Sequence, residues 1–165
     1  MRPATRKLTA ERLREVMTYD HMTGVLAWRG KRGGAEAGTI NKIDGYRRVC
    51  VDGEIMLAHR LVWFHVHGAW PDDIYDLDHK NSNRLDNRLC NLRLGTRSQN
   101  QFNVGPRKTN KSGYKGVSRR ANGQWWAKIR ANGKFYSLGL HDDPAVAHQA
   151  YVAAAKRLHG EFARI

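Results

Sequence analysis

The segment 74–103 constrains the fold of this chain more than any other stretch. Apolar and polar residues alternate over residues 74–77 and again over residues 91–94, which predicts two strands joined by a polar loop. We expect Gly95 to end the second strand. Thr96, with a glutamine three positions later, has the spacing of a capping box and predicts a helix. The predicted order is therefore strand, loop, strand and helix.

Four polar side chains in this segment suit the hydrolysis of a phosphodiester. His79 can act as the base for water, because neutral imidazole has a reference pKa of about 6.5. Asp78 and Asn100 offer oxygen atoms to a hard divalent ion, and such an ion completes its shell with phosphate and water. Asn91 lies where the loop returns, and we expect it to close the loop by side-chain to backbone hydrogen bonds and to help orient the histidine.

A plainer interpretation of the same residues is also open. An Asp-His dipeptide usually lies on a solvated surface, and an asparagine-rich loop usually reflects turn chemistry. Asn87 and Asn103 could also take the roles considered for the other asparagines. The joint spacing on a compatible strand, loop, strand and helix favours the catalytic interpretation.

In spacing and residue type this segment resembles the HNH nuclease motif. The resemblance continues upstream through residues 58–62 and is closest to the homing endonucleases of phages and introns, several of which also carry asparagine at the last motif position. It implies an α+β fold, with a ββα-metal core over 74–104 inside a nuclease domain over 1–104 that includes N-terminal α/β elements. It implies a divalent metal cofactor, Mg²⁺ or alternatively Mn²⁺. The site residues that it implies are Asp78, His79, Asn91 and Asn100, of which Asp78 and Asn100 bind the metal.

The charge of the chain predicts a polyanionic partner. The 165 residues carry a formal net charge of +14, and the hydrophobic fraction of 41% is ordinary for a globular protein. We expect double-stranded DNA as the partner, no small-molecule substrate and a monomeric chain. A run of 18 apolar residues is missing, which argues against a membrane partner, and the basic segment 1–7 has no apolar stretch behind it. These features predict a cytoplasmic protein, in the host cell if a phage encodes it.

Cysteines and the other histidines suggest no further metal site. Cys50 and Cys90 have no CxxC partners, so we expect packing residues in a reducing compartment. His59, His65 and His67 fall on a helix predicted over 58–67, and we expect core and packing histidines, with a supporting role for the first. The basic run 29–34 is equally compatible with a solvated loop and with phosphate contact.

The C-terminal third is predicted to form a separate basic module. Residues 105–113 are rich in Gly, Pro, Ser, Asn and positive charge, which is typical of a linker. From Gly105 onward, twelve Lys and Arg face three acidic residues, a net charge of +9. This concentration of charge favours a docking surface over general solubility.

Three strands and a helix are predicted within residues 114–165. The strands cover 114–119, 124–130 and 134–138, are joined by two Asn-Gly turns and precede a helix over 144–158. One face of the middle strand should be a core and the other basic with an aromatic residue. The core side consists of Trp125, Ala127 and Ile129, and the basic side of Trp126, Lys128 and Arg130. The helix stripe expected to pack on the sheet consists of Val146, Ala150, Ala154 and Leu158.

Residues 114–117, 125–130 and 138–139, together with the alanine-rich helix, resemble the DNA-binding domain of plant ethylene-response factors, the Apetala type. The resemblance implies a three-stranded antiparallel sheet that is packed on one helix and docks on DNA. Departures at Ser118 and Asn122, and further ones in the third strand, mean that the plant sequence preference is not carried over. The DNA contacts that we expect are Lys115, Arg119, Arg120, Trp126, Lys128, Arg130 and Lys134.

These observations together predict a metal-dependent DNA endonuclease that nicks or cleaves duplex DNA and is tethered by a C-terminal DNA-binding module. Two other classes of function stay open. The chain could be a non-catalytic DNA-binding regulator that keeps the HNH fold as a scaffold. It could also bind RNA, which a preference for single-stranded RNA over duplex DNA would indicate.

Overall fold

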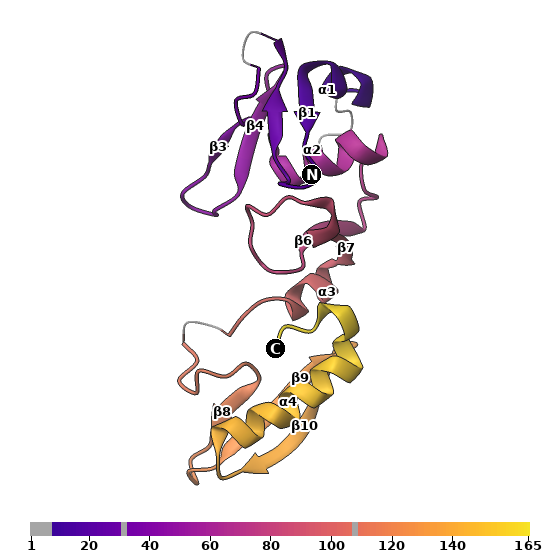
Figure 1. The fold of residues 1–165 in the computed structure, drawn as a ribbon. Helices are drawn as coiled ribbons and strands as arrows, with labels where there is room; N and C mark the ends of the chain where they lie inside the picture. Colours follow the sequence, from indigo (N-terminus) through magenta and orange to yellow (C-terminus); the bar gives the residue numbers. More distant parts are fainter. Residues whose placement is uncertain (1–7, 31–32, 107–108) are drawn as a thin grey trace. The chain divides into compact units, whose positions relative to one another are not determined.

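The computed structural model describes residues 8–30, 33–106 and 109–165, and the chain forms two compact units, Met1–Arg97 and Ser98–Ile165 (Figure 1). The N-terminal basic segment, two residues of the basic run 29–34 and two residues of the expected linker lie outside the described residues. Within the described ranges, no helix combines the length and the apolar character needed to cross a bilayer.

Short strands and short helices make up the first unit. Their bounds are α1 Ala10–Val16, β1 Met17–Tyr19, β2 Leu26–Trp28, β3 Thr39–Ile40, β4 Arg47–Val51, β5 Glu54–Leu57, α2 Ala58–His67, β6 Tyr75–His79, the 3-10 helix η2 Leu89–Asn91 and β7 Leu92–Thr96. They form three antiparallel sheets, β1-β2, β3-β4-β5 and β6-β7. The chain therefore has the α+β character that the sequence predicts.

Helix α2 forms the centre of the first core. Leu61 and Val62 on α2 are fully buried with Leu13 of α1, and further buried apolar residues from the strands complete the cluster. The helix ends at Gly68, whose φ of 72° places it in the left-handed region that glycine adopts without strain. The backbone N–H of Gly68 donates to the carbonyl oxygen of Phe64 at 2.9 Å, so the helix ends there and the chain continues toward β6.

The β6-β7 hairpin carries the expected motif. Its strands pair in register from Tyr75 with Thr96 to His79 with Leu92, and the helix α3 (Arg97–Phe102) follows directly. The expectation that Gly95 ends the second strand is wrong. This glycine is buried and paired with Asp76, because the strand has to continue for one residue more to complete the hairpin.

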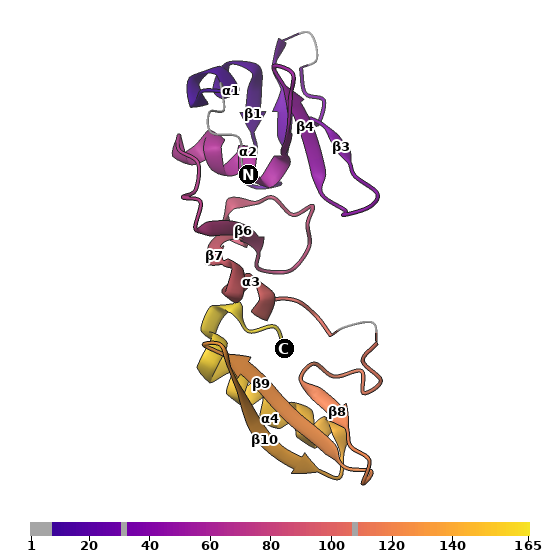
Figure 2. The ribbon, with the colours of Figure 1, turned by 180° about the vertical axis from the view of Figure 1, so that it is seen from behind.

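In the second unit one helix packs on one face of a three-stranded sheet. Its elements are β8 Val117–Arg119, β9 Trp125–Ala131, β10 Lys134–His141, α4 Pro144–His159 and the 3-10 helix η3 Gly160–Phe162. The strand order is β10-β9-β8, and α4 lies on one face only (Figure 2). Ala127 and Ile129 are buried under the helix and Arg130 is exposed, as the period-two pattern predicts.

The packing prediction for α4 is confirmed in part, and the one for the cysteines is wrong. The buried residues of α4 are Ala147, Tyr151, Ala154, Ala155 and His159. Of the predicted stripe, Ala154 is buried and Ala150 and Leu158 pack against the core, whereas Val146 is 49% exposed. Cys50 and Cys90 are exposed and not packing residues, since one lies on the outer side of β4 and the other in η2 next to the polar loop.

Replacing Gly116 by alanine should destabilise the second unit. Its φ is +76°, and a Cβ atom would lie 2.1 Å from Cδ2 of Tyr151, a ring fixed in the core. Gly133→Ala is the matched control, because its φ is +77° and no atom lies within 4 Å of its Cβ position. We expect Gly116→Ala to lower the free energy of unfolding by about 1–3 kcal/mol more than the control does, measured by urea denaturation. Equal losses would contradict the packing described for Tyr151.

Candidate active site

His79 ends strand β6 in a buried position with one ring nitrogen fixed. The side chain is 3% exposed, and Nε2 lies 3.0 Å from Oδ1 of Asn87, which is itself 4% exposed. An amide oxygen only accepts hydrogen bonds, so the neutral ring carries its proton on Nε2 and its lone pair on Nδ1. The loop thereby selects one tautomer of the histidine.

Two more rings surround this histidine and help to keep it neutral. The His59 ring meets it edge to face at 5.0 Å between centroids, and the Tyr46 ring lies at 6.0 Å. Burial lowers the pKa of His79 below its usual value, and burial, with the adjacent His79, lowers the pKa of His59 to about 3. Near pH 7 His79 is therefore in the form that can accept a proton.

Asp78 is oriented by an arginine on the neighbouring strand. Arg93 lies opposite it in the β6-β7 register and donates to its Oδ2 atom from Nε at 3.1 Å and from Nη2 at 2.8 Å. The arginine side chain is buried, so the pair is held in one geometry. The carboxylate of Asp78 is thus fixed beside His79, at the edge of the polar loop.

Asn91 closes the polar loop across its two arms. Its Oδ1 atom accepts a hydrogen bond from the backbone N–H of Asn81 at 3.0 Å, and its Nδ2 donates to the carbonyl oxygen of Asp86 at 2.7 Å. These are the side-chain to backbone hydrogen bonds expected at this position. The contact with the His79 ring comes from Asn87, which the sequence analysis raised only as a competitor.

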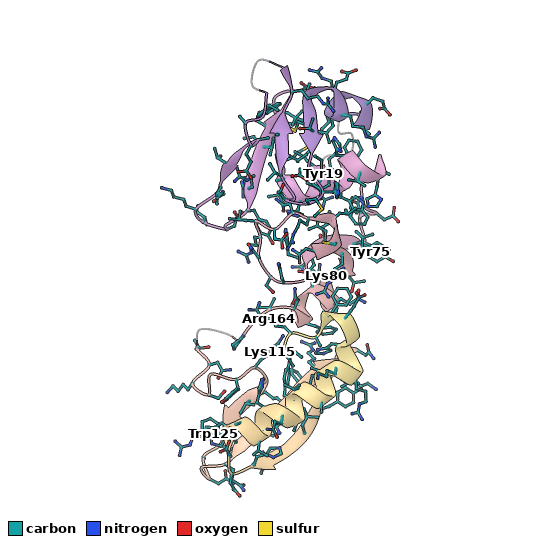
Figure 3. The ribbon with its side chains drawn as sticks, viewed as in Figure 1. Tyr19, Tyr75, Lys80, Lys115, Trp125 and Arg164 are labelled. Carbon is teal, nitrogen blue, oxygen red and sulfur yellow. The ribbon has the colours of Figure 1, made fainter. Side chains whose placement is uncertain are left out.

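The loop is also supported by residues far upstream that the sequence analysis missed. The hydroxyl of Tyr19, a residue labelled in Figure 3, donates to the carbonyl oxygen of Asn87 at 3.3 Å and accepts from the N–H of Leu89 at 2.9 Å. Gly24 is buried with a φ of +79°, and a Cβ atom there would lie 2.5 Å from the backbone nitrogen of Arg88. No local sequence pattern identifies these partners, because nearly seventy residues separate Tyr19 from the backbone that it contacts.

The two other candidate asparagines, Asn100 and Asn103, belong to the second unit. Asn100 lies on α3, most of which belongs to that unit, since the unit begins at Ser98. Asn103 is buried, and its carbonyl oxygen accepts a hydrogen bond from Arg164 at 3.4 Å. The pairing of Asn100 with Asp78 around a metal stays a prediction.

Asp78 offers one oxygen ligand to a divalent ion. Over the part of the chain that the structure describes, no three His, Cys, Asp or Glu side chains gather as a metal site. A single carboxylate suits Mg²⁺, which keeps several waters and binds substrate phosphate, and it supplies too few protein ligands for a structural zinc ion. The carboxylate of Asp78 therefore fits the kind of metal that the motif implies.

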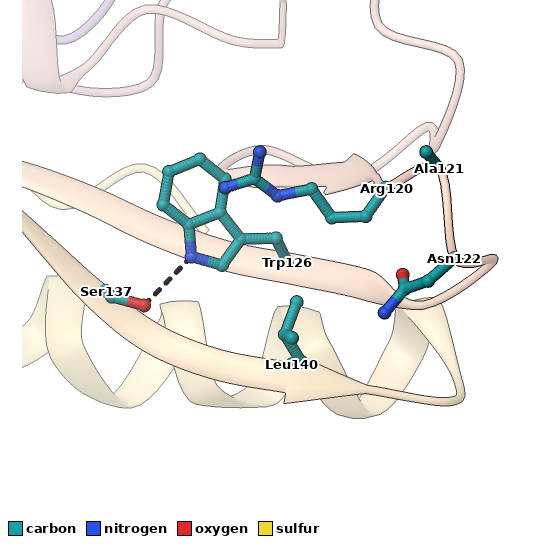
Figure 4. A pocket seen from close by; sticks show the side chains of 6 residues that line it. All are labelled: Arg120, Ala121, Asn122, Trp126, Ser137 and Leu140. Carbon is teal, nitrogen blue, oxygen red and sulfur yellow. Dashed lines mark hydrogen bonds between the residues drawn. The ribbon is translucent and has the colours of Figure 1, made fainter.

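The outer face of the second sheet combines cations with aromatic rings. Trp126 lies 3.8 Å from the Arg120 guanidinium and 4.5 Å from Nζ of Lys128, measured to ring centroids. Its Nε1 donates to Oγ of Ser137 at 2.9 Å, and Trp126, Ser137 and Leu140 line the same open hollow (Figure 4). These contacts hold the expected basic and aromatic side chains on one surface.

The other expected DNA contacts occupy different environments. Arg119, Arg130 and Lys134 are exposed, and the Arg130 guanidinium lies 5.2 Å from the Phe135 ring. Lys115 is half-buried and donates from Nζ to the carbonyl oxygen of Phe102, and burial lowers its pKa to about 8. Its ammonium group therefore serves the packing of its own unit.

The Asn87→Ala variant should disturb the tautomer of His79. Without the amide oxygen, the Nε2–H group of His79 loses its hydrogen-bond acceptor, so we expect a mixture of the two tautomers. Because a buried donor is then unsatisfied, we also expect the free energy of unfolding to fall by about 1–3 kcal/mol. Imidazole ¹⁵N chemical shifts, recorded above neutral pH, measure the tautomer. Asn83→Ala, at an exposed position of the same loop, is the control and should keep the Nε2–H form. An unchanged tautomer in Asn87→Ala would show that this contact does not select it.

Comparisons with known proteins identify the same segment. The family model described as HNH endonuclease matches residues 56–102. The chain is 36% identical over 109 residues to the mimivirus protein named "Uncharacterized HNH endonuclease L560", covering 66% of this chain and 56% of that protein. It is 35% identical over 107 residues to "Protein 3.8" of Escherichia phage T7, covering 64% of this chain and 87% of that protein.

One solved structure is also similar. It is titled "DNA binding and cleavage by the HNH homing endonuclease I-HmuI" and matches with 30% identity and a TM-score of 0.43, covering 53% of this chain and 50% of that one. The chain thus spans about half the length of that endonuclease and of the mimivirus protein. The extent of its similarity to the phage and mimivirus proteins, together with the family match, shows that the chain belongs to the HNH endonuclease family.

Proposed function

We propose that this protein is a metal-dependent endonuclease that hydrolyses phosphodiester bonds in double-stranded DNA. Residues 1–104 would form the catalytic domain and residues 114–165 a DNA-binding module, joined by 105–113. The observation that carries the proposal is the buried His79, held as one tautomer by Asn87 within the segment that matches the family.

In the proposed reaction, Nδ1 of His79 takes a proton from the water that attacks the phosphorus atom. Asn87 keeps the opposite ring nitrogen fixed, and its amide oxygen stabilises the positive charge that the ring gains. Asp78 and Asn100 would hold the divalent ion, Mg²⁺ or Mn²⁺, with Arg93 fixing the carboxylate orientation. When bound, the ion stabilises negative charge on the phosphate and on the leaving oxygen.

The second unit would supply most of the DNA affinity. Its outer sheet face presents Arg120, Lys128 and Arg130 beside aromatic rings, and it lies on the side of the sheet opposite α4. Phosphate contacts by such cations release counterions, so the affinity should fall steeply with salt. The chain would act as a monomer, because tethering through this module raises the effective DNA concentration at the catalytic unit.

A plasmid assay tests the catalytic proposal. Supercoiled plasmid is incubated with wild-type protein and Mg²⁺ or Mn²⁺, and relaxed and linear forms are followed over time. We expect metal-dependent nicking that EDTA abolishes and that His79→Ala lowers by about 100-fold or more, because the base is lost. His21→Ala, which removes an exposed histidine from a turn in the same unit, should retain wild-type activity. Wild-type protein that binds the plasmid and cuts none would instead support the non-catalytic regulator.

The salt dependence of binding tests the DNA-binding face. We expect the double variant Arg120→Ala/Arg130→Ala to bind duplex DNA more weakly and to lower the slope of log K against log salt concentration by about 2, since each lost phosphate contact contributes about 0.9. Lys156→Ala, combined with Arg157→Ala, removes the same charge from the exposed side of α4 and should leave the slope unchanged. Equal effects of the two double variants would indicate general charge attraction without a docking face.

A further inference from the structure

The turn between β3 and β4 ends in an apolar side chain that points into solvent. Ile43 is 96% exposed, the largest value among the exposed large hydrophobic residues that the structure describes. Its chain neighbour Lys42 is exposed as well. Leaving a whole isoleucine side chain in water forgoes the stabilisation that its burial would give, so this position offers apolar surface to a partner.

The turn that presents Ile43 is held by hydrogen bonds within itself. Asn41 exchanges two backbone hydrogen bonds across the turn, accepting from Gly45 at 2.7 Å and donating to Tyr46 at 2.9 Å. The Oδ1 atom of Asn41 also accepts from the N–H of Ile43 at 2.8 Å, and Asp44 is neutralised by Arg48 at 2.6 Å. Ile43 is thus held on an internally hydrogen-bonded turn, so less conformational entropy is lost when it contacts a partner. The ion pair of Asp44 with Arg48 also leaves the turn without net negative charge.

The same turn is attached to the catalytic loop. Nη1 of Arg84, in the polar loop after His79, donates to the carbonyl oxygen of Asp44 at 2.6 Å, and its guanidinium lies 4.9 Å from the Tyr46 ring centroid. Tyr46 in turn packs against His59 and His79. Figure 1 shows the β3-β4 turn beside the loop that follows β6. The position of Ile43 is therefore fixed relative to the base.

Single exposed apolar residues are common on protein surfaces and usually need no explanation. Ile55 and Ile74 in the same unit are each 70% exposed, one on β5 and one just before β6. Ile43 differs in being almost wholly exposed, next to Lys42, at the tip of a turn that Arg84 attaches to the loop following His79. A cationic surface with an apolar tip fits duplex DNA as the occupant, because cations meet the phosphates and the tip meets the bases.

We propose that Ile43 is a wedge that inserts between two base pairs next to the phosphate that is attacked. This inference rests on the proposed function of the site. Apolar side chains that enter a base step unstack it partially and kink the duplex. The kink would open the groove at the turn and bring the scissile phosphate within reach of His79. Sequences with easily unstacked steps would then be preferred at the cleavage site, without hydrogen bonds to their bases.

A topological assay tests insertion without cleavage. Closed circular plasmid is relaxed in EDTA by a topoisomerase that needs no metal, with wild type, Ile43→Ala, Ile43→Leu or Ile55→Ala bound, and the topoisomers are separated after protein removal. A wedge unwinds the bound duplex, so wild type, Ile43→Leu and Ile55→Ala should shift the linking number in proportion to bound protein. Ile43→Ala should lose most of this shift while its DNA affinity, measured separately, stays within about 3-fold. A linking-number change as large with Ile43→Ala as with wild type, or no change with wild type, would contradict the proposed insertion.

A kinetic experiment then links the wedge to the reaction. Once the nicking position has been mapped, single-turnover rates are measured on that duplex and on the same duplex with a mismatch at the neighbouring step. We expect Ile43→Ala to be slower by about 10-fold or more on the matched duplex and to recover most of this loss on the mismatched one, where unstacking costs less. An equal defect on both duplexes contradicts the proposal. If the wild-type protein shifts the linking number but never nicks DNA, the nuclease proposal is contradicted and the proposed insertion of Ile43 is still supported.

Discussion

The hydrogen bond between His79 and Asn87 is the interaction on which the site depends. A buried imidazole needs a partner for the nitrogen that carries its proton, because an unsatisfied buried donor is costly. The amide oxygen of Asn87 supplies this partner at 3.0 Å and so determines which nitrogen keeps the lone pair. Burial then lowers the pKa of the ring, and the two effects together yield a neutral base in one tautomer.

This requirement explains why the loop of the β6-β7 hairpin depends on N-terminal elements. Asn87 lies in a polar loop with little apolar surface of its own, and such loops are mobile unless other segments hold them. Tyr19 binds the backbone on both sides of Arg88, Gly24 permits close approach at the same place, and Arg84 attaches the loop to the β3-β4 turn. The first unit thus positions one asparagine from several directions.

Local sequence patterns predicted much of the secondary structure. They did not predict which residues from distant segments contact one another. The bounds of α2 agree with the prediction because its apolar residues stop where Gly68 takes a positive φ. The hairpin likewise follows from alternation, and α3 lies where the spacing of Thr96 and Gln99 predicted a helix. In contrast, Asn87 was only a competitor for the position beside His79, and Tyr19 and the buried face of α4 depend on contacts between distant segments. Periodicity gives no information on which of several asparagines in a loop turns inward, because that choice is made by packing.

Chemical rescue tests the central claim, that His79 is the base, most directly. In a His79→Gly variant the cavity left by the ring should admit free imidazole, which can accept the proton in its place. The account predicts that imidazole restores part of the metal-dependent nicking, with a rate that rises with the concentration of its neutral form, and that it leaves Asn87→Ala unaffected. Nicking that stays absent with imidazole in a folded, DNA-binding His79→Gly protein, or that is undiminished by the substitution itself, would contradict the assignment of His79 as the base.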